Sequence, residues 1–106
     1  DQRSRLERIA VEGADPTCRV LLMDVVLGHG AHPDPASELA PAIAAARDQA
    51  RETDRDLAVV VSLCASHDDP QVRRTQAERL REAGASIYLS NAAAARRAVS
   101  LVGAGS

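Results

Sequence analysis

An apolar block followed by a compact polar loop is the strongest constraint on how this chain can fold. Seven of the eight residues 20–27 (VLLMDVVL) are apolar, and GHGAHPDPA follows directly, with two glycines, two histidines and two prolines. Strands covered on both faces have continuous runs of Val, Leu and Ile instead of alternating polar residues. The block therefore predicts a fully buried strand of a parallel sheet over roughly Arg19–Leu27. Ligands of open α/β sheets bind beyond the carboxyl ends of the strands, so the loop marks the expected site.

The rest of the chain alternates between helical and strand patterns. Two more strands are predicted, over the apolar block Leu57–Ala65 and over residues 85–90. Helices are predicted in the segment 4–16 as far as Gly13, from about Ala36 to Glu52, from Asp69-Pro70 to Gly84, and from Asn91 to Gly103. Strands that alternate with helices form parallel sheets, so we expect an α/β, three-layer α/β/α flavodoxin-like domain with a short parallel sheet. Three strands make a thin sheet, and we expect a further strand or domain of a longer protein, or a partner chain, beside it.

The same spacing predicts which side chains of the first two helices are buried. The expected buried residues are Leu6, Ile9, Ala10, Leu39, Ile43 and Ala46. Asp34 is expected to cap the second helix, with Pro35 at the first helical position. The chain has no Phe, no Trp and one Tyr, so small aliphatic side chains must fill the core.

Composition excludes several classes of function. The net charge is -2, and the sequence lacks a basic stripe with interleaved aromatic residues, which argues against nucleic-acid binding. It contains neither an apolar run long enough to span a membrane nor a signal peptide pattern, so a cytoplasmic location is expected. The sequence begins at Asp1, inside a helical pattern, and we expect it to be a fragment of a longer chain.

Two sets of residues could in principle carry sulfur or metal chemistry. Cys18 and Cys64 lie next to or within predicted strands, and we expect buried, reduced thiols instead of a disulfide. His29, His32 and Asp34 fall within six residues. Zinc sites normally take ligands from separate elements with further support behind them, so we predict no metal site and local hydrogen bonds for these histidines.

Three blocks of the sequence resemble the FdrA family, which is related to acyl-CoA synthetases and to the alpha subunit of succinyl-CoA synthetase. The blocks are LLMDVVLGHGAHPDPASELAPAI, LAVVVSLCASHDDP and LREAGASIYLSNAAAARRA. The resemblance covers nearly the whole chain and implies that residues 1–106 form a ligase-CoA-type domain of flavodoxin-like fold. It implies partners among the other domains of a longer chain, with a homo-oligomer as a further expectation. It also implies that this segment binds no cofactor, while CoA and a nucleotide would bind elsewhere in the longer protein.

The two expected catalytic residues are Asp24 and His32. The resemblance makes Asp24 the counterpart of an acidic residue that, in the related ligases, helps to hold a phosphohistidine. His32 belongs to the GAHPDPA motif of the family. The alternative for Asp24 is structural, because an ionised carboxylate in an apolar strand needs hydrogen bonds from the backbone, a side chain or an Arg.

Four further residues are expected to bind a ligand. Gly28 and Gly30 could bring backbone amides close to an anion at the start of the second helix. Ser66 follows the second predicted strand. Asn91 follows the third, where it would cap the last helix and face the crevice if the first and third strands were neighbours.

The loop after the second strand departs from the related ligases. Their phosphohistidine loop is rich in glycine, whereas residues 66–70 are SHDDP. Two hypotheses follow. The chain is a ligase-CoA-type domain of an FdrA-like acyl-CoA synthetase or acyl/carbamoyl transferase, inactive alone and contributing strand-end loops to a site that other domains complete. Alternatively, it is a non-catalytic assembly module that has lost the phosphohistidine loop. A stand-alone binder of receiver type is disfavoured, because the chain has no Lys.

Overall fold

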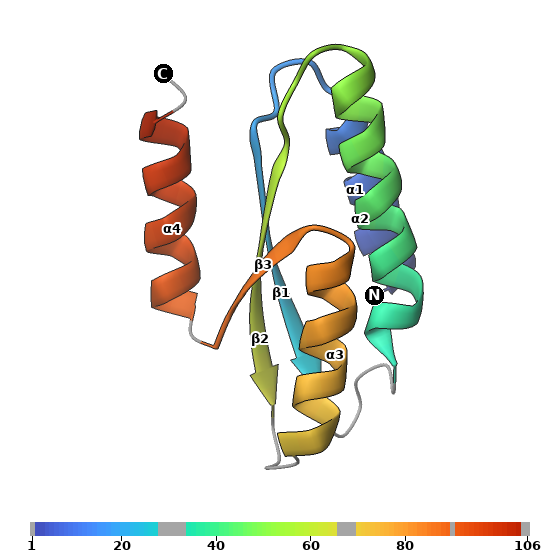
Figure 1. Ribbon diagram of the computed structural model, residues 1–106, viewed down its shortest axis with the longest axis vertical. Coiled ribbons are helices and arrows are strands. Elements are labelled where there is room, and N and C mark those ends of the chain that lie inside the picture. The colour runs from blue at the N-terminus through green and yellow to red at the C-terminus, as the bar shows by residue number, and fades with distance from the viewer. Residues whose placement is uncertain (1, 28–33, 66–69, 90, 105–106) are drawn as a thin grey trace.

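The computed structural model describes residues 2–27, 34–65, 70–89 and 91–104 (Figure 1). Helices and strands alternate throughout: α1 (Gln2–Ala14), β1 (Val20–Leu27), α2 (Pro35–Glu52), β2 (Ala58–Ala65), α3 (Pro70–Glu82), β3 (Ala85–Tyr88) and α4 (Asn91–Ala104). The predicted order of elements is confirmed, and most of the predicted ends agree to within about two residues. Among the described residues, no helix is long and apolar enough to cross a membrane.

The strands form a parallel sheet in the order β1-β2-β3. β1 and β2 are aligned along their whole length, from Val20 opposite Ala58 to Leu27 opposite Ala65. β3 is shorter, and its last residue, Tyr88, lies opposite Ser62. Helices α1, α2 and α3 lie on one side of the sheet and α4 lies on the other, which confirms the three-layer α/β/α arrangement (Figure 1).

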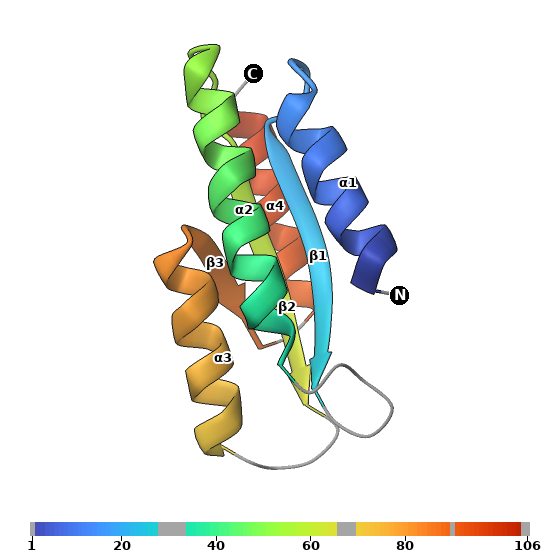
Figure 2. The ribbon, with the colours of Figure 1, turned by 90° about the vertical axis from the view of Figure 1, so that its right-hand side faces the viewer.

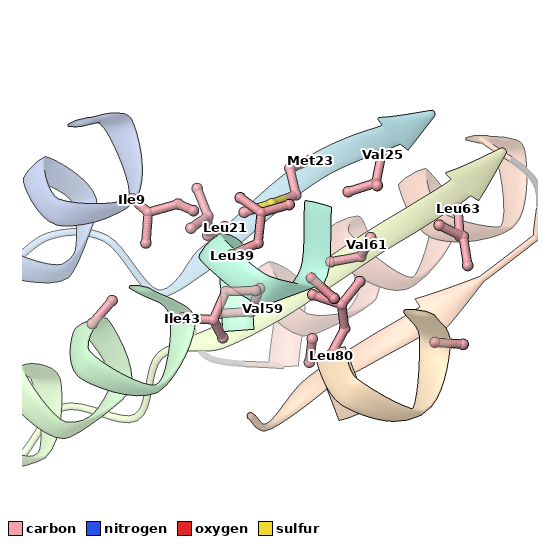
Figure 3. Packing of buried hydrophobic residues seen from close by; sticks show 14 of the residues in the cluster. Ile9, Leu21, Met23, Val25, Leu39, Ile43, Val59, Val61, Leu63 and Leu80 are labelled. Carbon is pink, nitrogen blue, oxygen red and sulfur yellow. The ribbon is translucent and has the colours of Figure 1, made fainter. Parts of the chain in front are cut away.

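The core lies between the sheet and the layer of three helices (Figure 3). Val59, Val61 and Leu63 of β2 pack there with Leu39 and Ile43 of α2, and all five are almost fully buried. Leu80 of α3 and Ile9 of α1 close this core at its two sides. Burying each aliphatic side chain of this size contributes roughly 1.5–3 kcal/mol, so this apolar face is the main stabilising feature of the fold.

The prediction that β1 is buried on both faces is wrong. Leu21, Met23, Val25 and Leu27 are buried on the α2 side, whereas Asp24 and Val26 on the other side are exposed. The cause is the position of β1 at the edge of the sheet, where α4 covers one face only in part. The central strand β2 is the one buried on both faces, and Val60 on its α4 side is completely inaccessible.

Helix α1 also differs from the prediction at one position. Ile9 is buried and Leu6 is half-buried, as expected, but Ala10 is exposed. Gly13 is buried because α1 passes very close to α2 there, and a Cβ atom on Gly13 would lie 2.7 Å from the Cβ of Ala46. This glycine therefore does more than stop the helix, since it permits two helices to touch.

Candidate functional site

The carboxyl ends of β1 and β2 lie side by side at one edge of the sheet. Leu27 is opposite Ala65, and each strand is followed by one of the two loops predicted to carry the site. Four predicted ligand or catalytic residues, Gly28, Gly30, His32 and Ser66, lie outside the described residues. The parallel register brings the ends of β1 and β2 to this edge, while the position of the site and the roles of these four residues stay predictions.

Asp34 connects the first of these loops to α2 and is anchored to α3. Its carboxylate accepts a hydrogen bond of 2.7 Å from Nε2 of Gln76 and two of 3.0 and 3.1 Å from Nη1 of Arg79. The hydrogen bonds from Gln76 and Arg79 hold the pKa of Asp34 below its usual range. Asp34 is therefore charged at neutral pH, and its charge is compensated by α3.

Gln76 supplies the capping hydrogen bond that was expected from Asp34. Asp34 occupies the N-cap position and Pro35 starts the helix, as predicted, but the Asp34 side chain makes no capping hydrogen bond. The backbone N–H of Ala36 instead donates to Oε1 of Gln76 at 2.9 Å. Gln76 is only 4% exposed, so one amide group joins the start of α2 to the end of the loop.

Sequence reasoning missed Gln76 and Arg79. Both lie on α3, more than forty residues from Asp34, and a polar residue in a helix gives no local sign of a distant partner. The one usable signal is that Gln76 and Ala77 occur where the 3.6-residue period of α3 places its buried face.

Asp24 is solvent-exposed and lies within β1, three residues before the end of the strand. Three residues of strand span about 10 Å, so the carboxylate is set back from the edge by about that distance. In the sheet register Asp24 is opposite Ser62, and Ser62 is opposite Tyr88. These three polar residues form a row on the α4 side of the sheet. The prediction of a carboxylate in an apolar environment is wrong, because water can solvate Asp24.

Asn91 begins α4, immediately after the loop that follows β3. The hypothesis that it would face the crevice required β1 and β3 to be neighbours. The observed order places β2 between them, and β3 ends three residues short of β2. The main chain at Asn91 is therefore one strand further from the β1 loop than the prediction assumed.

Neither Cys18 nor Cys64 forms a disulfide, and both are half-buried, less than the full burial that was predicted. Burial, together with the neighbouring carboxylate of Glu12, raises the pKa of the Cys18 thiol to about 11. Cys18 is thus protonated at neutral pH and is a poor nucleophile. In the part of the chain that the structure describes, no group of three or more His, Cys, Asp or Glu side chains could hold a metal ion.

The comparisons with known proteins assign the chain to a family. The CoA-ligase family model matches residues 1–101. The chain belongs to the CoA-ligase family. It is 30% identical over 91 residues to an Escherichia coli (strain K12) protein described as uncharacterized protein YahF, a match that covers 86% of this chain and 18% of YahF. The chain therefore spans less than a fifth of that relative's length. No solved structure matches it.

Proposed function

We propose that this chain is the ligase-CoA-type domain of an FdrA-like acyl-CoA synthetase or acyl/carbamoyl transferase. The observation that carries the proposal is the family match over residues 1–101. These residues contain the parallel sheet, in which the carboxyl ends of β1 and β2 lie at one edge. The loops after these strands would contribute to a site that other domains of a longer protein complete. A cytoplasmic location belongs to the same proposal.

Within this proposal, His32 takes part in the reaction at the carboxyl ends of the strands. Asp24 lies within β1, three residues before that end. The exposed carboxylate of Asp24 could accept a proton or hold a cationic group. Asp34 has a different role, because Gln76 and Arg79 already occupy its carboxylate. It would fix the end of the loop that carries His32.

We propose that CoA and a nucleotide bind to other parts of the longer protein. Both ligands carry phosphates, which need cations or helix amides that are not already paired. Arg79 is the cation that contacts the end of the β1 loop, and it donates to both oxygens of Asp34. The first described amide of α2 after its proline, that of Ala36, is occupied by Gln76. Because both groups are already paired, they do not fit a phosphate site.

The test uses a longer protein that contains this chain. Asp24→Asn and His32→Ala are each expected to lower the rate of acyl-CoA formation or carbamoyl transfer by at least about tenfold, since a positioned acid or base typically contributes roughly 10²–10⁴-fold. The matched control is Asp56→Asn, an exposed carboxylate in the turn before β2, which should leave turnover unchanged. Thermal unfolding of each variant checks that the fold is retained.

Two results would contradict the proposal. Unchanged turnover in both variants, with normal thermal unfolding, would indicate an assembly domain instead of a catalytic one. Robust ligase activity from the isolated 106 residues would show that no other domain is needed.

A further inference from the structure

The first turn of α2 is held by both of the helices that flank it. In Figure 2, α2 lies between α1 and α3, and it begins at the same end of the molecule as the arrowheads of β1 and β2. From α1, Nε2 of Gln2 donates to the carbonyl of Pro35 at 3.4 Å. From α3, Gln76 and Arg79 donate to the carboxylate of Asp34. The point where the loop after β1 joins α2 is therefore fixed from two sides.

Gln76 and Arg79 contribute to this turn in different ways. Gln76 is 4% exposed, and it also accepts the N–H of Ala36, so its hydrogen bonds are shielded from water and stabilise the start of the helix. The ion pair of Arg79 with Asp34 is solvent-accessible, with side chains that are 48% and 43% exposed. An exposed ion pair adds little to stability, because water already solvates both charges. Arg79 is thus not needed to keep the turn folded.

The geometry of the ion pair indicates what Arg79 adds. Its Nη1 donates to both carboxylate oxygens of Asp34, at 3.1 and 3.0 Å, and so restricts rotation of the carboxylate. The carbonyl of Asp34 is held as well, by the hydroxyl of Ser37 at 2.7 Å. His32 is two residues before Asp34 in the sequence, so its main chain is tethered within about 7 Å of this anchor. Orientation of Asp34 therefore limits where His32 can lie.

Helix α3 also begins where the other strand-end loop ends. Its first residue, Pro70, directly follows residues 66–69, which connect it to β2. Arg79 is nine residues further along the same helix, a distance of about 14 Å. One helix therefore holds the end of the loop after β2 with its own backbone and the end of the loop after β1 with the side chain of Arg79.

We propose that Arg79 is a positioning residue: acting through Asp34, it sets the loop after β1 relative to the loop after β2, without contacting the substrate itself. The proposal rests on the proposed function, in which these two loops contribute to the site. Displacing a reacting group by about 1 Å can cost roughly 100-fold in rate. A contact that adds little stability can therefore have a large effect on turnover.

The experiment measures kcat, KM and Tm for variants of the longer protein that contains this chain. Arg79→Ala should lower kcat for acyl-CoA formation or carbamoyl transfer at least about tenfold and change KM less than about twofold. Its Tm should fall by no more than about 4 °C. A residue with a merely structural role would lower Tm and leave kcat unchanged at temperatures where the variant is folded.

Two further variants make the test specific to this ion pair. Arg79→Lys should keep most of the activity, because both hydrogen bonds of Arg79 come from one nitrogen atom, which an ammonium group can replace. Arg74→Ala is the matched control, since Arg74 is another exposed arginine of α3, and it should leave kcat as it was.

The outcomes distinguish this proposal from the proposed function. If His32→Ala lowers turnover and Arg79→Ala does not, the positioning role is overturned while the proposed function stands. If neither variant lowers turnover, both are overturned. An equal loss in Arg79→Lys and Arg79→Ala, or a rise in KM with kcat unchanged, would mean that the guanidinium binds the substrate directly. A fall in Tm of more than about 8 °C in Arg79→Ala would assign Arg79 to the stability of the fold.

Discussion

The amide of Gln76 is the contact whose removal tests the structure most directly. In Gln76→Leu, the side chain keeps its apolar stem, but the N–H of Ala36 loses its acceptor and Asp34 loses one donor. Ala36 is 1% exposed, so water cannot easily replace the acceptor. A buried N–H left without a partner costs about 1–3 kcal/mol, and we expect the free energy of unfolding to fall by about 2 kcal/mol. For a domain of this size that corresponds to a decrease in Tm of roughly 8–16 °C.

Urea denaturation followed by circular dichroism measures this change, with Gln71→Ala as the matched control. Gln71 is exposed in the first turn of the same helix, and its substitution should change stability by no more than about 0.5 kcal/mol. An equal loss in the two variants, or a loss below about 0.5 kcal/mol for Gln76→Leu, would refute the assignment of Gln76 as the cap of α2.

A second substitution at the same position separates the two hydrogen bonds. Gln76→Glu keeps an oxygen for the Ala36 N–H but sets a carboxylate against that of Asp34. In the unsubstituted protein, the lowered pKa of Asp34 stabilises the fold above its ordinary value of 3.8, and this contribution is lost as the pH falls through the folded-state pKa. In Gln76→Glu the repulsion should make acidification stabilising instead, because one protonated carboxyl can donate to the other. Denaturation midpoints measured between neutral pH and the acid range would show whether the sign reverses.

Two further predictions follow from single side chains. Gly84→Ala should destabilise the protein by at least about 1 kcal/mol, because Gly84 has a φ of +104° and a Cβ atom there would lie 1.5 Å from Nη1 of Arg47; an unchanged urea midpoint would contradict this. The Cys18 thiol, with its pKa raised to about 11, should react slowly with iodoacetamide at pH 8 and faster as the pH approaches 11, which mass spectrometry of the labelled peptides would follow; rapid labelling at pH 8 would show that burial does not protect it.

Local patterns in the sequence were sufficient for the order and type of the elements. Runs rich in Val and Leu identified β1 and β2, and the 3.6-residue spacing of Leu39 and Ile43 identified the buried face of α2. The parallel direction followed from the alternation of strands and helices, because a connecting helix returns the chain to the same end of the sheet. The family match over residues 1–101 agrees with the wider group to which the sequence motifs pointed.

The site depended on relations that no local pattern contains. Whether a strand lies at the centre or at the edge of a sheet is decided by its neighbours in space, and this is why Asp24 is exposed in an apolar run while Ser62 is buried. In the same way, the partners of Asp34 come from α3, and their approach depends on how α2 and α3 pack together. Periodicity along the chain therefore determined the elements of this protein. Only the tertiary structure decided which of the described strands lies at the centre of the sheet and which charges meet, because both follow from contacts between residues far apart in sequence.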